Sequence, residues 1–498
     1  MRWSVVRRLG MTSVLAMVQF ATINLVVTEL AMTQSAVAQE NWLQADFRRE
    51  SERAADACKG GFKAAAGCGI ELFTDHPLHI AAGSMPPQNG FGLGMAFSES
   101  RNTKNWRLSW DVDAVGATSG AWRAGGYMKL VHTPGEPIHV ITPVIPQPGE
   151  APAAKPTEKE KKSAINLVHP YTVFNLYAQS ISLNKLNYFG LGNDTALAGA
   201  SVFGMTQTIV GASAIKPVYE WAAIRKLNLA LLGELNGRFV NVRGENGQSV
   251  PSIETLYTNA TAPGLSSQPG FVQLSQGVRI KPVIADYLQL NYAGNFQEFF
   301  APSSSQNSFL RWTVDLNHTL YLYGYTQSAP KSTDGNGPDS CAPAGEKCPE
   351  VSRSRNLNGS INLRLLLSES INSATSAVPF YFQQTLGGSD INGALALGSY
   401  QDYRYRAPNL LLLQESFEHS IWGPFGLKFM ADEGRVAQTR GDLGFSHLRH
   451  SFAGGLTLRA GGFPMVSLMF AWGGPEGHHN IFNMNTSLLG GSARPLLD

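Results

Sequence analysis

Charged residues are scarce in this chain of 498 residues, since Asp, Glu, Lys and Arg together make up only 15% of it. Soluble proteins carry about a quarter of such residues, so the composition is unusual for a soluble enzyme. The 39 Lys and Arg nearly balance the 37 Asp and Glu, and the net charge of +2 does not indicate binding to nucleic acid. Intrinsic disorder is excluded as well, because 10% of the residues are aromatic.

Long apolar runs are also missing. The mean hydropathy of −0.11 is too polar for several membrane-spanning helices of about 20 apolar residues each. What the chain does have is glycine, with 51 residues, together with many aromatic side chains. A chain that is neither strongly apolar nor strongly charged fits a transmembrane β-barrel, whose strands alternate lipid-facing apolar residues with lumen-facing polar ones.

The first 38 residues have the features of an export signal. Three arginines within the first eight positions precede an uncharged stretch, residues 9–28, and the small residues Ala36 and Ala38 offer a cleavage site. An uncleaved membrane anchor is the alternative, although several polar residues dilute the uncharged stretch. We therefore predict that residues 1–38 are a signal peptide and that the chain is exported to an oxidising compartment.

The four cysteines form two local pairs, Cys58 with Cys68 and Cys341 with Cys348. A zinc site would need closer CxxC spacing and histidine partners, which neither pair has. In an exported chain, two short-range disulfides are therefore expected, with free thiols in loops as the alternative.

An alternation with a period of two residues begins near residue 78. Apolar and polar residues alternate in 106–114, and the pattern returns in 227–239, 310–322 and 361–365. Successive side chains of a strand point to opposite faces, so each segment has one apolar and one polar face. A soluble sandwich would alternate too, but most of these segments exceed the five or six residues typical of soluble strands. We predict an all-β fold, a transmembrane antiparallel β-barrel of about 16 strands.

The barrel is expected to occupy residues 76–489. It is preceded by a short periplasmic segment, residues 39–75, which is charged and helical or irregular, and followed by a tail at 490–498. Residues 133–165, rich in proline and charge, predict a mobile loop. Residues 328–353 predict a disulfide-tied surface loop, which we place outside the cell because such barrels carry their long loops there.

The sequence lacks several common enzyme motifs. The chain has no GxSxG or HExxH motif and no Gly-Lys pair of a phosphate-binding loop. His419 and Ser420 are adjacent, so a lipid hydrolase that uses them is the enzymatic alternative. The pair His478 and His479 is better explained by interface positions. We expect no catalytic centre, no metal site and no cofactor.

Four stretches, in order, resemble the BamA/TamA family of outer-membrane assembly barrels, also described as bacterial surface antigens. Residues 188–195 are similar to the family segment YxGLGNDT, and residues 386–406 to the loop LGGxxxLRGYxxYRFR. Residues 415–436 are similar to E…FxDxGxV, and residues 451–489 to the closing strands. The motif positions are Gly190, Gly192, Asn193, Asp194, Gly387, Gly388, Glu415 and Gly434.

The resemblance implies that residues 387–407 fold back into the barrel lumen. In the family, the arginine of the RGY motif contacts the aspartate of the FxDxG strand. Gly398 stands at the arginine position here, so we predict that Arg404 or Arg406 pairs with Asp432 instead. The alternative is that this carboxylate simply faces water. The expected loop–lumen contact residues are Gly398, Tyr400, Arg404, Arg406 and Asp432.

The resemblance also implies a function in the bacterial outer membrane, namely the insertion or passage of proteins or lipids. Outer-membrane lipid, protein clients and periplasmic factors would be the partners, with no nucleic acid among them. Family members usually carry client-binding POTRA domains, but residues 39–75 are too few to form one. We therefore interpret the chain as a barrel without POTRA domains. A passive pore and a structural or adhesive barrel are the alternatives.

Overall fold

The computed structural model describes residues 52, 77–132, 171–218, 227–244, 249–285, 287–323, 359–373, 375–422, 424–460, 463–484 and 495–497. The chain divides into two compact units, Met1–Cys68 and Gly69–Asp498, and every described strand belongs to the second. The predicted signal peptide, all four cysteines and the predicted loops 133–165 and 328–353 lie outside the described residues, as does the segment 39–75 apart from Glu52.

Strands dominate the part of the chain that the structure describes. In the first half they are β1 (Leu78–Ser84), β2 (Phe91–Asn102), β3 (Trp106–Ala117), β4 (Trp122–His132), β5 (Thr172–Tyr188), β6 (Ser201–Pro217) and β7 (Ala230–Gly244). In the second half they are β8 (Phe271–Ile280), β9 (Val283–Ala285), β10 (Leu288–Phe300), β11 (Phe309–Tyr323), β12 (Gly359–Ile371), β13 (Gln384–Leu386), β14 (Tyr405–Ala407), β15 (Asn409–Trp422), β16 (Phe425–Ala437), β17 (Arg449–Ala460), β18 (Phe463–Trp472) and β19 (His478–Met484). A one-turn helix, α6 (Ile253–Leu256), lies between β7 and β8.

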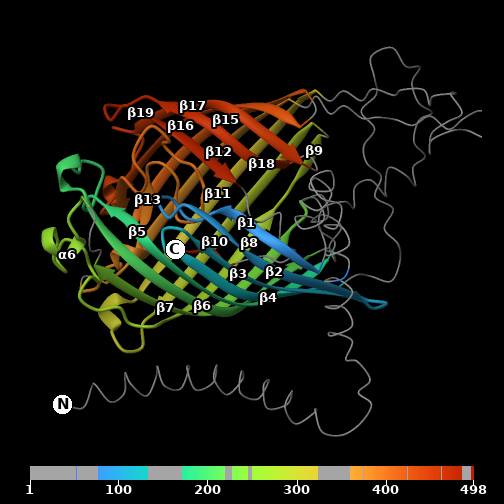
Figure 1. Cartoon of the computed structure of the whole chain (residues 1–498), viewed down its shortest axis with the longest axis horizontal. Helices are drawn as coiled ribbons and strands as arrows, with labels where there is room; N and C mark the ends of the chain where they lie inside the picture. The colour runs from blue at the N-terminus through green and yellow to red at the C-terminus, as the bar shows by residue number, and fades with distance from the viewer. Residues whose placement is uncertain are drawn as a thin grey trace, which may run out of the picture. The chain divides into compact units, whose positions relative to one another are not determined.

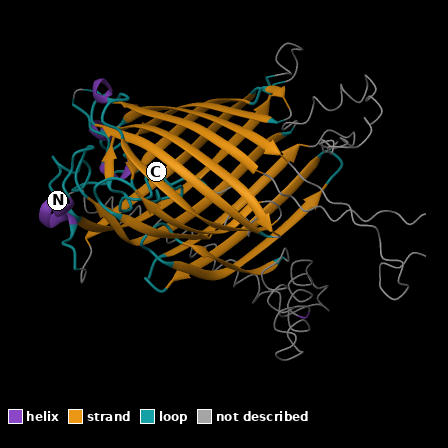
Figure 2. Cartoon of the chain, turned by 90° about the horizontal axis from the view of Figure 1, so that it is seen from above, coloured by secondary structure: helices purple, strands orange, loops and turns teal. Residues whose placement is uncertain are grey.

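The strands of the main sheet pair antiparallel with their neighbours in the sequence, from β1 with β2 to β18 with β19. Two exceptions occur: β12 pairs with β15 across a long connection, and β8 and β9 both pair with β10. Since β9 continues β8, the 17 strands of the sheet occupy sixteen positions. Figures 1 and 2 show the sheet curling round on itself, and Cα atoms of β1 and β19 approach within 8 Å. The predicted fold, an antiparallel barrel of about 16 strands, is confirmed.

The wall of the barrel is apolar outside and polar inside. On β7, Leu231, Leu235 and Phe239 are 47%, 55% and 58% exposed, whereas Asn236 and Arg238 are each 2% exposed. Soluble proteins bury the first kind of residue and expose the second, so the pattern is inverted. Exposed apolar residues on other strands include Leu93, Met95, Val112, Leu176, Val210, Leu363, Phe429, Leu456, Leu468, Phe470 and Phe482. Among the described residues, no helix is long and apolar enough to span a bilayer.

Successive connections alternate between the two ends of the barrel because neighbouring strands run in opposite directions. We call the end where β1 begins and β19 finishes the terminal end, and the opposite end the loop end. The connections that contain residues 133–165 and 328–353 join β4 to β5 and β11 to β12, so both open at the terminal end. The side of the membrane on which residues 328–353 lie, which we expect to be the outside, stays a prediction. The long connection between β12 and β15, residues 372–408, opens at the loop end.

Candidate functional site

The connection between β12 and β15, residues 372–408, packs inside the barrel at the loop end, where Figure 2 shows the described loops gathered. Its aromatic side chains reach the inner faces of distant strands. Phe380 packs edge-to-face against Phe203 of β6, with ring centroids 5.1 Å apart, and Phe382 packs in the same way against Phe271 of β8 at 4.9 Å. Such contacts add to the burial of apolar area and fix how the rings lie. We call this connection the lumen loop.

The lumen loop also binds the opposite side of the wall through its main chain. The amide of Leu397 donates to Oδ2 of Asp432 on β16 at 3.0 Å, and the amide of Ser399 donates to Oγ of Ser451 on β17 at 2.8 Å. Gln414 of β15 donates to Oδ1 of Asp432 at 3.1 Å. Leu397 has a φ of 55°, a left-handed conformation that costs a side-chain-bearing residue about 1–3 kcal/mol. The contacts with the wall hold the backbone in this strained form.

The predicted ion pair between Asp432 and Arg404 or Arg406 is wrong. Within the described residues, both carboxylate oxygens of Asp432 accept hydrogen bonds from the amide and glutamine groups named above, and both arginines bind elsewhere. At Gly398, the position of the motif arginine, a Cβ would lie 2.9 Å from Cδ1 of Ile481, so a side chain there would require Ile481 to shift. The loop presents the amide of Leu397 to Asp432 instead.

Arg404 joins three connections at the loop end. Its Nε donates to Oε1 of Glu476, in the turn between β18 and β19, at 2.6 Å. Its Nη1 and Nη2 donate to Oγ1 and the carbonyl oxygen of Thr195, in the connection between β5 and β6, both at 2.6 Å. The guanidinium also lies over the ring of Phe189 at 4.9 Å and that of Tyr405 at 4.7 Å. With the side chains of the ion pair 3% and 7% exposed, the pair is desolvated and depends on its complete set of partners.

Arg406 is held without a carboxylate partner among the described residues. Its Nη1 donates to the carbonyl oxygen of Phe380 at 2.7 Å, and its guanidinium faces the rings of Tyr188 and Phe380. Its own carbonyl oxygen accepts the amide of Gly192 at 2.8 Å. Burial lowers the pKa of Arg406 to about 10, so the side chain stays charged at neutral pH.

Four motif glycines adopt backbone conformations that other residues rarely tolerate. The φ angles of Gly190 and Gly192 are 95° and 104°, and those of Gly387 and Gly388 are 106° and 61°. The first pair shapes the connection that meets Arg404 and Arg406, and the second pair turns the lumen loop beside Arg404. Glycine occurs at these positions because it adopts positive φ angles without a steric penalty.

The other motif residues have different surroundings. A Cβ on Gly434 would lie 2.9 Å from Leu386, so glycine there lets β13 approach the wall. Asn193 donates to the carbonyl oxygen of His447 at 3.4 Å, and Asp194 accepts from Arg449 at 3.0 Å. Glu415 follows the inward Gln414 on β15 and is exposed on the outer face, away from the loop. Tyr400 is buried in the loop, with its ring centroid 5.4 Å from that of Tyr405.

The hydrolase alternative built on His419 and Ser420 is not supported by their positions. Both residues belong to β15, where consecutive side chains point to opposite faces of the wall. The ring of His419 lies 6.2 Å from that of Phe417, two residues earlier on the same face. The hydroxyl of Ser420 therefore points away from the imidazole that should activate it. In the part of the chain that the structure describes, no three His, Cys, Asp or Glu side chains are grouped to hold a metal ion.

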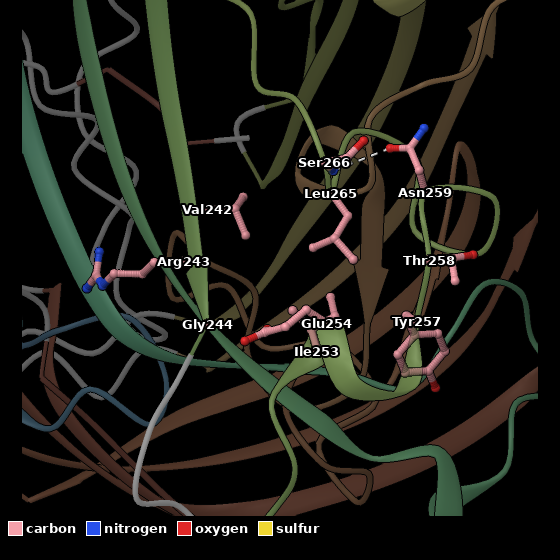
Figure 3. Close-up of a pocket in the computed structure, with 10 residues that line it drawn as sticks. All are labelled: Val242, Arg243, Gly244, Ile253, Glu254, Tyr257, Thr258, Asn259, Leu265 and Ser266. Atoms are coloured by element: carbon pink, nitrogen blue, oxygen red, sulfur yellow. Dashed lines mark hydrogen bonds between the residues drawn. The ribbon is translucent and has the colours of Figure 1, made fainter.

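A cavity of ≈310 Å³ opens at the loop end, between the end of β7 and the connection to β8 (Figure 3). Figure 3 shows Arg243 and Tyr257 on opposite sides of it. Arg243 donates to Oδ1 of Asn184 at 2.6 Å, and Tyr257 donates to the carbonyl oxygen of Gly199 at 2.6 Å. Because these polar groups are already engaged, the lumen loop remains the stronger candidate for the functional site.

The sequence did not reveal the partners of the lumen loop. Thr195 lies in the connection between β5 and β6, Glu476 in the turn between β18 and β19, and Gln414 is one of several polar residues on β15. Arg404 and Glu476 are 72 positions apart, and they meet because the folded barrel brings the lumen loop next to the turn between β18 and β19. One signal in the sequence is the glycine at position 474. Its φ is 74°, and a Cβ there would collide with Tyr400 of the lumen loop.

No protein-family model matches the chain, and no curated protein matches it. Solved structures do. CdiB from Acinetobacter baumannii is 9% identical with a TM-score of 0.44, over 82% of this chain and 60% of that one. BamA from Haemophilus ducreyi lacking POTRA domains 1-3 is 11% identical with a TM-score of 0.42, over 82% and 68%. CdiB from Escherichia coli is 10% identical with a TM-score of 0.46, over 82% and 62%.

This chain spans 60% of the length of the first of these structures, so it corresponds to only part of that protein. The barrel architecture rests on the strand pairings described above and not on these similarities.

Proposed function

We propose that the chain is a bacterial outer-membrane β-barrel that inserts or passes polypeptides or lipids by a non-covalent route. The inverted wall supports the membrane location. Exposed apolar residues such as Leu235 and Phe239 would face hydrocarbon, while buried polar residues such as Arg238 line the interior. The motif resemblance of residues 188–195 and 386–436 to BamA/TamA barrels supports the choice of function.

The lumen loop is the observation that carries the proposal. It spans the interior from β6 and β8 on one side to β16 and β17 on the other. The described contacts that hold it are side-chain packing, hydrogen bonds and the ion pair of Arg404 with Glu476. These contacts are all reversible, so the loop can leave its place without breaking a bond. A passive pore needs a free path through the interior, and the lumen loop crosses that interior at the loop end. An adhesive barrel would be favoured by projecting loops, and the lumen loop packs inside instead.

A reversible lock on the lumen loop tests the proposal. The amide of Ser399 lies 2.8 Å from Oγ of Ser451, so the double variant Ser399→Cys, Ser451→Cys places two thiols where the loop meets β17. In proteoliposomes that contain a small outer-membrane barrel as client, we expect the oxidised form to lose client insertion and the reduced form to regain it. Ser399→Cys alone, treated in the same way, is the control.

Equal insertion by the oxidised and reduced double variant, with the cross-link verified, would count against the proposal. The passive-pore alternative is measured in planar bilayers. A steady conductance of the wild-type barrel that does not change on oxidation of the double variant would favour a pore.

A further inference from the structure

A short segment beyond the last barrel strand lies against the lumen loop. Pro495 and Leu497 are buried while Leu496 between them is 68% exposed, an alternation that indicates an extended chain. Leu497 is 7% exposed and packs in the same apolar cluster as Phe203 and Phe380. The segment 495–497 is therefore held inside the barrel as an extended peptide.

Asn392 of the lumen loop binds both main-chain groups of Leu497. Its Nδ2 donates to the carbonyl oxygen of Leu497 at 2.7 Å, and its Oδ1 accepts the amide of Leu497 at 2.8 Å. These two bonds contact only the backbone, as in the addition of an extended peptide to a strand edge. Asn392 is itself held by Asp390, whose Oδ1 accepts the amides of Asn392 and Ala394 at 2.9 and 2.7 Å. The backbone at Asn392 is thus held by contacts within the lumen loop itself.

The cavity that receives Leu497 has capacity for more ligand than the segment supplies. Its volume is ≈150 Å³, and Leu497 lines it together with Tyr381, Tyr403, Arg406 and Leu412. Tyr381 Oη, Tyr403 Oη and Arg406 Nε are buried and have no hydrogen-bond partner among the described residues. Buried donors without partners are costly. Each can donate a hydrogen bond, so the carbonyl oxygens of a longer peptide that uncovered these atoms would satisfy them.

We propose that this cavity is a binding site for an extended peptide with a branched aliphatic side chain, and that residues 495–497 occupy it at rest. Asn392 binds the peptide backbone, the apolar cluster takes the aliphatic side chain, and the tyrosine and arginine groups bind further carbonyls. The inference rests on the proposed function only in that a polypeptide client enters the lumen. Such a client would displace residues 495–497 and remove their contact with the lumen loop.

The test uses a variant in which residues 495–497 no longer fill the site and measures the binding of an added peptide. Leu497→Asp removes the aliphatic side chain, and Leu496→Asp adds the same charge at the neighbouring exposed position as a matched control. The probe is a fluorescent peptide with the sequence of residues 490–498, measured by anisotropy on the purified full chain in detergent. We expect saturable binding to Leu497→Asp, and at least about tenfold weaker binding to wild type and Leu496→Asp, because the attached segment competes at high effective concentration.

A second variant tests the two hydrogen bonds between Asn392 and the peptide backbone. Adding Asn392→Ala to Leu497→Asp removes two hydrogen bonds, so the affinity for the probe should fall by about tenfold. Asn392 is exposed, so its replacement should leave the fold intact. A folded Leu497→Asp barrel without saturable binding would overturn the inference, as would equal binding to both aspartate variants. Because the measurement needs no membrane and no client, normal peptide binding with failed client insertion would count only against the proposed function.

Discussion

On the outer face of β7, Leu235 and Phe239 are more than half exposed, whereas on its inner face Asn236 and Arg238 are buried. The inner residues hold one another, since Nε of Arg238 donates to Oε1 of Gln273 at 2.5 Å and to Oδ1 of Asn236 at 3.2 Å. The outer residues have no comparable directional contacts. The contribution of outer-face residues to stability therefore depends on the surrounding medium. The contribution of inner-face residues depends on their hydrogen-bond partners.

The two faces should respond to mutation in different ways. Any apolar residue of similar size should serve on the outer face, but a charge should not, because lipid cannot solvate it. On the inner face, removing one partner leaves the other buried and unsatisfied, so the cost depends on position and geometry. The four predictions below test this contrast, from the largest expected effect to the smallest.

Arg404→Ala should have the largest effect, because it leaves the carboxylate of Glu476 buried without its cation. Breaking a buried ion pair from one side costs about 3–5 kcal/mol. We expect that loss in urea unfolding of the barrel in lipid, with faster hydrogen exchange across the lumen loop. Arg404→Lys keeps the charge but loses the bonds to Thr195, so its cost should be smaller. Unchanged unfolding of Arg404→Ala would show that the inner face is less specific than we infer.

Leu235→Arg places a charge on the outer face, where Leu235 is 55% exposed. An arginine facing the middle of the bilayer destabilises a barrel by about 2–4 kcal/mol, with smaller costs near the interfaces. We expect this loss in lipid vesicles, and almost none for the control Leu235→Ile. If the arginine variant were as stable as the control in vesicles, this part of the wall would not face lipid.

The contrast between the faces also explains what the sequence could predict. Residues 106–114 and 310–322 fall within β3 and β11, because alternation is a local pattern that one strand carries alone. The inward position of residues 387–407 was expected from a motif resemblance and not from their composition. The partner of Arg404 could not be predicted, since it comes from a turn 72 positions away. Nor could the hydrogen bond of Leu397 to Asp432, because any residue offers the same amide.

Asp432→Asn should have an intermediate effect. The carboxylate accepts one hydrogen bond on each oxygen, from Leu397 and from Gln414. An asparagine has only one acceptor oxygen, so one donor would face its NH₂ group, at a cost of about 1–3 kcal/mol. We expect faster hydrogen exchange at Leu397 and Ser399. The matched control is Glu415→Gln, an exposed outer-face carboxylate next to Gln414. Equal protection in both variants would contradict the assigned contact.

Arg440→Ala should have the smallest effect, although its ion pair is as short as that of Arg404. Nε of Arg440 lies 2.5 Å from Oε2 of Glu369, compared with 2.6 Å between Arg404 and Glu476. The difference is burial of the arginine, since the Arg440 side chain is 57% exposed and that of Arg404 only 3%, while the carboxylates of Glu369 and Glu476 are 13% and 7% exposed. Water and salt screen a pair whose cation is exposed, so its loss should cost about 0–1 kcal/mol and less as the salt concentration rises. Urea unfolding at low and high salt measures this. If Arg440→Ala destabilised the barrel as much as Arg404→Ala, the distance between the charged atoms rather than their burial would determine how much each ion pair contributes to stability.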